Sequence, residues 1–185
     1  MKRAFDLALA LFVVATASWV VLLAVIAIKL DSRGPAFFRQ LRVGKDQQPF
    51  RMLKLRTMAQ GTASVPSHEA PKAAITPVGA WLRKTKIDEL PQVWSVITGD
   101  MSFVGPRPCL PNQYELIAER ESRGVFKLRP GITGPAQLAG VDMSTPKRLA
   151  EIDAGYADGQ TFAGDLAIIC NTVIGRGRGD AAQSS

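Results

Sequence analysis

The hydrophobic pattern divides the chain into an apolar start and a mixed remainder. From Leu7 to Ile28 the sequence runs for 22 residues without a charged side chain. As a straight helix rising 1.5 Å per residue, this run would be about 33 Å long, enough to cross the hydrocarbon layer of a bilayer. It is too long for a signal peptide, and no small-residue cleavage site follows it. The pattern therefore predicts a membrane helix over residues 1–30.

Charges on both sides of the run bear on its topology. Lys2 and Arg3 precede it, and Lys29 and the basic remainder follow it. A helix that spans the membrane would place one basic flank outside, against the positive-inside tendency. A helix that enters and returns avoids this conflict but needs a bend, which Thr16 and Ser18 would supply by bonding to carbonyls one turn earlier. We expect a re-entrant helix; the alternative is a single-span anchor.

Beyond the apolar run, the pattern predicts one hairpin followed by helices. Residues 37–43 and 50–56 alternate with a period near two around turn-forming residues, which indicates a β-hairpin. The further expectations are a mobile loop at 59–77, helices at 77–86, after 88, and at 112–123, 146–157 and 162–174, irregular chain at 99–100, 105–111 and 130–135, and a flexible basic tail at 175–185. Together they predict a single domain of mainly helical α+β class over residues 1–185, with residues 31–174 in the cytosol.

The charge balance narrows the partners. A net charge of +7 fits either nucleic acid or an anionic membrane surface. Acidic residues are interleaved with the basic ones and few aromatic residues accompany them, so the membrane is favoured; a nucleic-acid binder would leave the apolar run unexplained. Cys109 and Cys170 lack metal-ligand spacing, as in a reduced, cytosol-facing protein.

The single histidine limits the chemistry. His68 lies in a stretch that reads as an ordinary loop. A Ser-His-Asp or Cys-His mechanism is therefore excluded, and catalysis must use carboxylates, arginines and lysines.

The segment Leu82–Gln92 carries the candidate chemistry. Asp88 and Glu89 are adjacent carboxylates before a predicted helix. In a purely structural interpretation, the two acidic residues stabilise the amino terminus of the helix. Thr85 and Asp88 also have the spacing of a capping box. Their chemical interpretation is a nucleophile for phosphorus, which needs nearby cations and a divalent metal. Arg83 suits the first need, and we expect Arg83, Lys84 and Lys86 to hold Asp88 ionised. Arg107, in a proline-rich turn, is a second candidate phosphate ligand.

A series of short motifs, taken in order, resembles one protein family. The motifs are Lys2-Arg3-x-x-Asp6, Lys29-Leu-Asp-Ser-x-Gly34-Pro35, Arg42-Val-Gly44, Lys54-x-Arg56-Thr-Met58, Leu82-Arg-Lys-Thr85, Asp88-Glu-Leu-Pro-Gln92, Gly99-Asp-Met-Ser102, Val104-Gly-Pro-Arg-Pro108 and Arg129-Pro-Gly-Ile-Thr-Gly134. They resemble the small monotopic phosphoglycosyl transferases, or bacterial sugar transferase family. The resemblance covers roughly residues 1–140.

The resemblance implies a fold and a reaction. It implies a monotopic protein at the cytoplasmic face of the bacterial inner membrane, with interfacial amphipathic helices. It implies transfer of a sugar-1-phosphate from a UDP-sugar to polyprenol (undecaprenyl) phosphate, with release of UMP and a magnesium requirement. By family precedent, Asp88 attacks the sugar-linked phosphorus, and Asp88 and Glu89 are also the expected metal ligands. The expected substrate-binding residues are Arg83, Arg107, Lys54, Arg56, Pro106 and Gln137.

Three departures from the family pattern affect these expectations. Ser18-Trp19 stands where members carry Ser-Pro, Pro135 replaces a tryptophan, and Val141 replaces an arginine that would contact the donor. They leave open a catalytically silent membrane adaptor of the same fold. Residues 108–113 and 143–146 are reminiscent of members that handle N-acetylated hexosamines or deoxyhexosamines, so such a donor is expected. The sequence does not predict the oligomeric state.

Overall fold

The computed structural model of the chain describes residues 1–62 and 74–175. The central part of the expected 59–77 loop, with His68, and residues 176–185 of the expected tail lie outside this range. The helices are α1 (Lys2–Asp31), η1 (Lys45–Gln47), α2 (Pro77–Thr85), η3 (Ile87–Gln92), α3 (Val93–Thr98), α4 (Tyr114–Ser122), η4 (Val125–Lys127), α5 (Pro135–Leu138), α6 (Pro146–Asp158) and α7 (Phe162–Val173). The strands are β1 (Phe37–Val43), β2 (Pro49–Leu55), β3 (Ser102–Val104) and β4 (Gly131–Thr133). The described chain is thus mainly helical with a small hairpin, as predicted.

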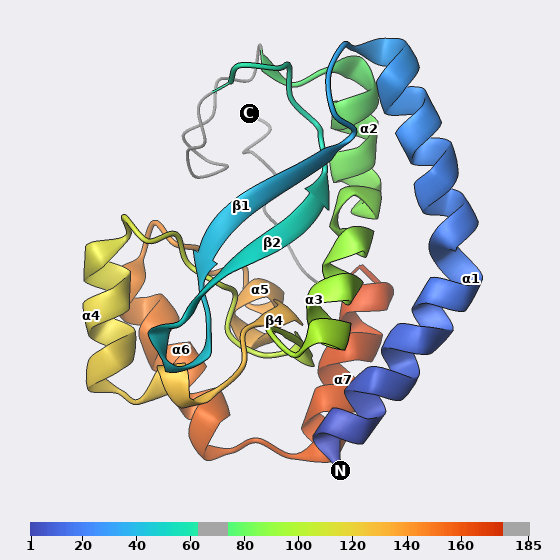
Figure 1. Cartoon of the computed structure of the whole chain (residues 1–185). Helices are drawn as coiled ribbons and strands as arrows, with labels where there is room; N and C mark the ends of the chain where they lie inside the picture. The colour runs from blue at the N-terminus through green and yellow to red at the C-terminus, as the bar shows by residue number, and fades with distance from the viewer. Residues whose placement is uncertain (63–73, 176–185) are drawn as a thin grey trace.

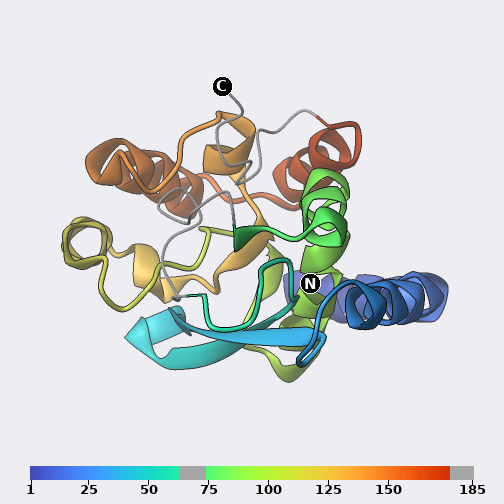
Figure 2. The same ribbon diagram turned by 90° about the horizontal axis from the view of Figure 1, so that it is seen from above.

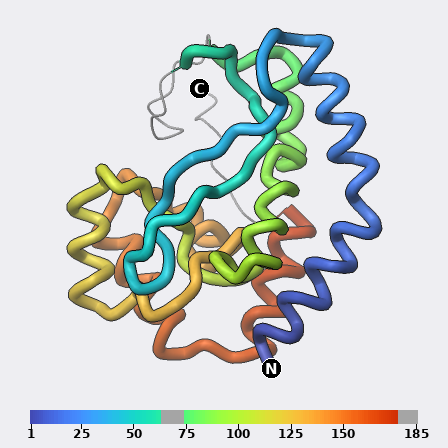
Figure 3. Tube along the Cα trace, viewed as in Figure 1, coloured from blue at the N-terminus to red at the C-terminus, as the bar shows by residue number. Residues whose placement is uncertain are grey.

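Helix α1 is a single long helix that packs only near its two ends. Its buried residues are Asp6 and Ala10 near the start and Ala24 and Ile28 near the finish. Large apolar side chains between them, such as Trp19 at 62% exposure, face outward. By length and composition alone, α1 could cross a membrane. Its path changes direction about halfway along (Figure 1, Figure 3).

The predicted bend has a local counterpart in α1. Thr16 Oγ1 donates to the carbonyl of Phe12 at 2.8 Å, one turn earlier. Such back-bonding competes with the main-chain hydrogen bonds and bends helices without a proline. Thr16 therefore makes the local hydrogen bond that was predicted to bend the helix, which stays a prediction for Ser18.

The hairpin has the register that its alternation predicts. Strands β1 and β2 are antiparallel, with Gln40 opposite Met52 and Phe38 opposite Lys54. The turn contains η1, in which Asp46 takes a left-handed conformation with φ 51°. Phe50, Met52 and Leu55 point from β2 into the core, while Arg51 faces solvent. Leu55 joins Leu82 and the end of α1 in one core cluster, so the hairpin is fixed against both α1 and α2.

Two short strands occur that the pattern did not predict. Residues 131–133 were predicted as loop but form β4, which pairs in parallel with β3, Ser102 opposite Gly131 and Val104 opposite Thr133. Gly131 permits this approach, since a Cβ there would lie 2.1 Å from the amide nitrogen of Gly105. Strands of three residues are too short to show a period of two, which is why the pattern did not reveal them.

The helices surround these strands on two sides. Helix α1 lies at one side of the molecule, and α4 and α6 lie at the other (Figure 1, Figure 2). Helix α7 packs beside the start of α1, where the rings of Phe5 and Phe162 meet edge to face with centroids 5.1 Å apart. The second core cluster, which contains Leu116 and Leu149, joins α4 to α6.

Two of the three departures have structural roles. Pro135 occupies the first turn of α5, where a proline costs no hydrogen bond because that N–H has no partner within the helix. Val141 packs, half-buried, against the core cluster that contains Leu116 and Leu149. Both residues serve the local fold of this chain.

Candidate active site

Asp88 and Glu89 are placed by an abrupt change of helix. Helix α2 ends at Thr85, Lys86 takes a left-handed conformation with φ 58°, and η3 begins at once. The predicted capping box is wrong. Thr85 Oγ1 donates backward to the carbonyls of Trp81 and Leu82, and no side chain caps η3. The turn at Lys86, which sends the chain into a new direction, therefore positions the two carboxylates.

Glu89 is held by two cations from distant parts of the chain. Its Oε1 accepts hydrogen bonds from Lys54 Nζ at 3.0 Å and from Arg107 Nη2 at 2.9 Å. The three side chains are 13–19% exposed. Burial raises the pKa of Glu89, but the charges of Lys54 and Arg107 outweigh it and hold that pKa well below its usual range. Glu89 is therefore a fixed anion rather than a proton carrier near neutral pH.

Asp88 lies in a different electrostatic environment. It is 8% exposed. Burial and the neighbouring negative charge of Glu89 raise its pKa to about 6, against the opposing charges of Lys54, Arg83 and Arg107. At pH 7 a group with that pKa is about 90% ionised. Asp88 is thus an anion held at higher energy than an exposed aspartate, as suits a nucleophile.

The cations around Asp88 differ in part from those expected, since only Arg83 of the three predicted is among them. Lys84 and Lys86 are exposed, and the basic residues that lower the pKa of Asp88 are Lys54, Arg83 and Arg107. The prediction is therefore confirmed for Arg83 and wrong for Lys84 and Lys86. The cations come from β2, from α2 and from the chain after β3.

Arg83 is oriented for a ligand. Its Nε donates to Thr57 Oγ1 at 2.9 Å. Its Nη1 is buried and, among the residues that the structure describes, has no hydrogen-bond partner. A buried donor without a partner costs free energy, and a phosphate oxygen is a strong acceptor for a guanidinium. Arg83 therefore offers a preformed contact for an anionic substrate.

The other predicted substrate-binding residues have structural partners. Arg56 donates to the carbonyls of Arg33 and Ser32 at the end of α1. The carbonyl of Pro106 accepts from the amide of Gly131 at 2.9 Å. Gln137 Nε2 donates to the carbonyl of Ile132, while its buried Oε1 is unpaired within the described residues. The structure thus joins Asp88, Glu89, Lys54, Arg83 and Arg107 in one cluster and gives Arg56, Pro106 and Gln137 bonds outside it.

A buried ion pair that sequence reasoning missed supports the cluster. Arg120 Nη1 donates to the carbonyl of Arg107 at 2.8 Å. The same guanidinium pairs with Asp153 at 2.7 Å, with both side chains at most 2% exposed. Helix α4 reads as a charged, solvated helix, so nothing in the sequence distinguishes Arg120 from its exposed neighbours. Only the pairing of α4 with α6 reveals that it supports Arg107.

Asp88 and Glu89 have the donor chemistry of a magnesium site that is shared with substrate. The described residues contain no cluster of three or more His, Cys, Asp or Glu side chains, so they offer no all-protein cage. Magnesium is commonly bound by one or two carboxylates together with substrate phosphates and waters. The two adjacent carboxylates fit that second pattern.

Comparison with known proteins identifies the family. The sequence model of the bacterial sugar transferases matches residues 1–177. The "Uncharacterized sugar transferase EpsL" of Bacillus subtilis is 38% identical over 94% of this chain and 85% of its own length. Two relatives bear the name "UDP-glucose:undecaprenyl-phosphate glucose-1-phosphate transferase". That of Caulobacter vibrioides is 39% identical over 93% of this chain and 68% of its own length. That of Escherichia coli is 36% identical over 94% of this chain and 39% of its own length. The chain therefore belongs to the bacterial sugar transferase family and is a phosphoglycosyl transferase.

Proposed function

We propose that this chain transfers a sugar-1-phosphate from a UDP-sugar to polyprenol phosphate, with release of UMP. The observation that carries the proposal is the cluster around Asp88. A buried carboxylate with a pKa of about 6 lies beside three cations, of which Arg83 keeps a buried donor that is unpaired within the described residues. Such a site suits a phosphoanhydride, which needs both a nucleophile and charge neutralisation.

In the first step, a carboxylate oxygen of Asp88 attacks the phosphorus that carries the sugar. The bond from that phosphorus to the bridging oxygen breaks, and UMP leaves with the electron pair. In the second step, an oxygen of the lipid phosphate attacks the same phosphorus and displaces Asp88 as carboxylate. Both reactions proceed without a histidine, in keeping with the single His68 of the chain.

The cations have separate roles in this proposal. Arg83 Nη1 donates to a phosphate oxygen of the donor, while its Nε stays on Thr57. Arg107 and Lys54 are held by Glu89 at the edge of the cluster and stabilise the charge that develops in the transition state. Glu89 contributes by fixing these two cations.

Magnesium is part of the proposal, with Asp88 and Glu89 as the residues that would hold it. When bound, it would stabilise the negative charge on the diphosphate oxygens. Glu89 suits this role because its lowered pKa keeps it ionised, and ligation requires the deprotonated carboxylate.

We also propose that α1 is re-entrant and that the domain lies on the cytoplasmic face of the inner membrane. The same polar domain holds both ends of α1. At the start, Asp6 accepts from Ser102 Oγ at 2.9 Å, and at the end, Arg56 donates to the carbonyl of Ser32 at 2.8 Å. A straight span of 30 residues would separate those ends by about 45 Å and draw the domain into the hydrocarbon layer. A helix that enters and returns keeps the domain in water.

The donor sugar has two candidates. The names of the relatives from Caulobacter vibrioides and Escherichia coli favour UDP-glucose. The sequence of residues 108–113 and 143–146 favours an N-acetylated hexosamine. A panel of UDP-sugars separates them, and UDP-glucose is the first to test.

The test of the proposed function is UMP release by the full chain in detergent. UMP is expected with a UDP-sugar, polyprenol phosphate and magnesium. Asp88→Asn should abolish it. An exposed-site variant, Arg148→Gln, is the matched control and should keep wild-type activity. No UMP from any donor in the panel, with the protein folded, would favour the silent adaptor.

A further inference from the structure

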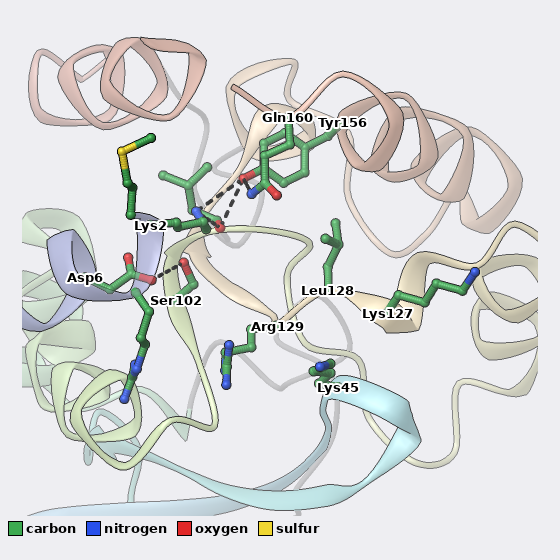
Figure 4. Close-up of a pocket in the computed structure, with 12 residues that line it drawn as sticks. Lys2, Asp6, Lys45, Ser102, Lys127, Leu128, Arg129, Tyr156 and Gln160 are labelled. Carbon is green, nitrogen blue, oxygen red and sulfur yellow. Dashed lines mark hydrogen bonds between the residues drawn. The ribbon is translucent and has the colours of Figure 1, made fainter. Parts of the chain in front are cut away.

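The structure contains a polar cavity away from the Asp88 cluster. It has a volume of about 320 Å³ and lies between the start of α1, the hairpin turn, β3, residues 127–129 and the end of α6 (Figure 4). That volume is within the range of small-molecule sites. Lys45 lies at the turn of the hairpin, while Lys54 of the catalytic cluster lies near the other end of β2. The separation along the strand is on the order of 17 Å. Among the described residues, the cavity shares no lining residue with the catalytic cluster.

The cavity carries an excess of positive charge. Of the described residues that line it, Lys2, Arg3, Lys45, Lys127 and Arg129 are basic, and Asp6 alone is acidic. The carboxylate of Asp6 is already engaged, since it accepts from Ser102 Oγ at 2.9 Å and from the amide of Phe103 at 3.2 Å. Like charges gathered around a cavity attract an anion.

Two of these basic residues already bind other groups of the protein. Lys2 Nζ pairs with Asp165 at 2.6 Å. Arg3 donates to the carbonyls of Val96 and Ile97, which are neutral acceptors and leave its charge uncompensated.

The other basic residues of the cavity have N–H donors that are available to a ligand. Arg129 donates from Nε to the carbonyl of Gly99 at 2.8 Å. Within the described chain, its terminal nitrogens have no hydrogen-bond partner, and neither does Lys127 Nζ. Lys45 has a loose, exposed pair with Asp46 at 3.8 Å. Arg129 and Lys45 lie on the hairpin side of the cavity, opposite Lys2 and Tyr156 (Figure 4).

We propose that this cavity binds the phosphate headgroup of an anionic phospholipid. The lipid assignment follows from its position. The cavity adjoins the first turn of α1, and the apolar run begins at Leu7. A headgroup in the cavity would lie where the apolar run meets the polar domain, and basic pockets beside membrane helices bind anionic headgroups.

The inference rests on the proposed membrane placement of α1 and not on the catalytic step. Its test therefore measures binding without turnover, so failure here leaves the UMP assay unaffected. The full chain is purified in neutral detergent, and native mass spectrometry follows binding of phosphatidylglycerol and of phosphatidylcholine with the same acyl chains. Inorganic phosphate serves as the soluble competitor.

The test variant is Lys45→Gln/Arg129→Gln, and Arg39→Gln/Arg51→Gln is a control with the same loss of charge at exposed strand positions. Wild type should prefer phosphatidylglycerol. The test variant should bind it about ten- to thirty-fold more weakly, given the usual effect of two cations near a lipid surface, and the control should stay within about threefold. Single Lys45→Gln, at an exposed turn, gives a smaller loss in the same direction if the double variant folds poorly.

Three results would overturn the proposal. Equal weakening in the control would mean a general charge effect. Equal binding of phosphatidylcholine would remove the selectivity for an anionic lipid. Displacement of the lipid by millimolar inorganic phosphate would make the ligand a free anion.

Discussion

At the scale of single residues, two adjacent carboxylates have pKa values displaced in opposite directions. Glu89 contacts Lys54 and Arg107 directly, so its pKa is low. Asp88 is buried beside the negative charge of Glu89, so its pKa is high. Neighbours in sequence thus take different roles because Glu89 accepts hydrogen bonds from Lys54 and Arg107, whereas burial has the largest effect on Asp88. The division separates an anion that holds cations from one that can react.

The pKa of Asp88 predicts the acid limb of the pH profile. Asp88 attacks only when ionised, and its pKa is about 6. As the pH falls below 6, the ionised fraction falls, so kcat/KM should drop about tenfold per pH unit. Glu89 adds no second limb there because it stays ionised. Steady-state kinetics from pH 5 to 8 measure this; a flat profile down to pH 5 would contradict the role of Asp88.

Replacing Arg107 should reduce turnover far more than stability. Arg107→Ala removes a cation that stabilises developing charge, so kcat should fall by about 100- to 1,000-fold, with expression near normal. Arg107→Lys should recover little, since an ammonium cannot reproduce the planar fork. Arg123→Ala removes an exposed i,i+4 pair with Glu119 and is the control, with little effect expected. Activity of Arg107→Ala near wild type would remove Arg107 from the site.

The sequence predicted the residues of the Asp88 cluster better than the residues that support them. Asp88, Glu89 and Arg83 lie close together in the chain, and their chemical types alone indicate phosphate chemistry. Thr57 and Arg120 have ordinary types in ordinary contexts. Their roles depend on contacts 26 residues away, from Arg83 to Thr57, and 13 residues away, from Arg120 to Arg107. Arg56 has the right type for phosphate but caps the end of α1, which its motif does not reveal.

At the scale of elements, the contact between α2 and the chain after β2 positions Arg83. Gly79 lies against Thr57, and a Cβ at position 79 would be 2.0 Å from the carbonyl oxygen of Thr57. Thr57 also receives the hydrogen bond of Arg83. One close approach therefore sets both the packing of α2 and the direction of the Arg83 side chain.

Gly79→Ala should therefore affect both stability and turnover. The added methyl meets backbone, so α2 must shift, with an expected loss of about 1–3 kcal/mol in the free energy of unfolding. The shift moves Arg83, so kcat should fall as well. Gly155→Ala is the matched control in a helix: no atom lies within 4 Å of its Cβ position, and it should stabilise the protein by up to about 1 kcal/mol. Thermal unfolding and kinetics measure both; unchanged stability of Gly79→Ala would contradict this account.

Long patterned elements were predictable, and short paired ones were not. The apolar run gave α1, and alternation gave the hairpin, because each extends over enough residues to show its period. Strands β3 and β4 have three residues each, and they pair across a gap in sequence that no local pattern spans. The hydrogen bond from Thr16 to the carbonyl of Phe12 was predictable as well, since it joins residues one turn apart.

At the scale of the whole molecule, α1 joins two regions of one domain at its two ends. Its start contacts β3 and α7 through Asp6 and Lys2, and its end contacts the hairpin through Arg56. The middle stays exposed. The domain therefore binds α1 at both ends and leaves its apolar middle exposed.

Labelling of cysteines in intact cells tests the re-entrant placement. In a Cys170→Ser background, which removes the exposed native thiol, a cysteine at position 2 and one at position 160 should both resist a membrane-impermeant reagent and react after lysis. Lysis is the internal control for reactivity. Labelling at position 2 from outside intact cells would contradict the re-entrant model and support a single span.

The most direct test of the catalytic account is the mass of the intact protein after it is mixed with donor alone. A nucleophilic Asp88 predicts that the wild-type chain, with UDP-sugar and magnesium but no lipid, gains the mass of one sugar phosphate and releases UMP. Asp88→Asn should gain nothing, because an amide cannot form the acyl phosphate. Polyprenol phosphate should then remove the added mass. If no adduct forms and UMP appears only when both substrates are present, the transfer is direct and Asp88 is not the nucleophile.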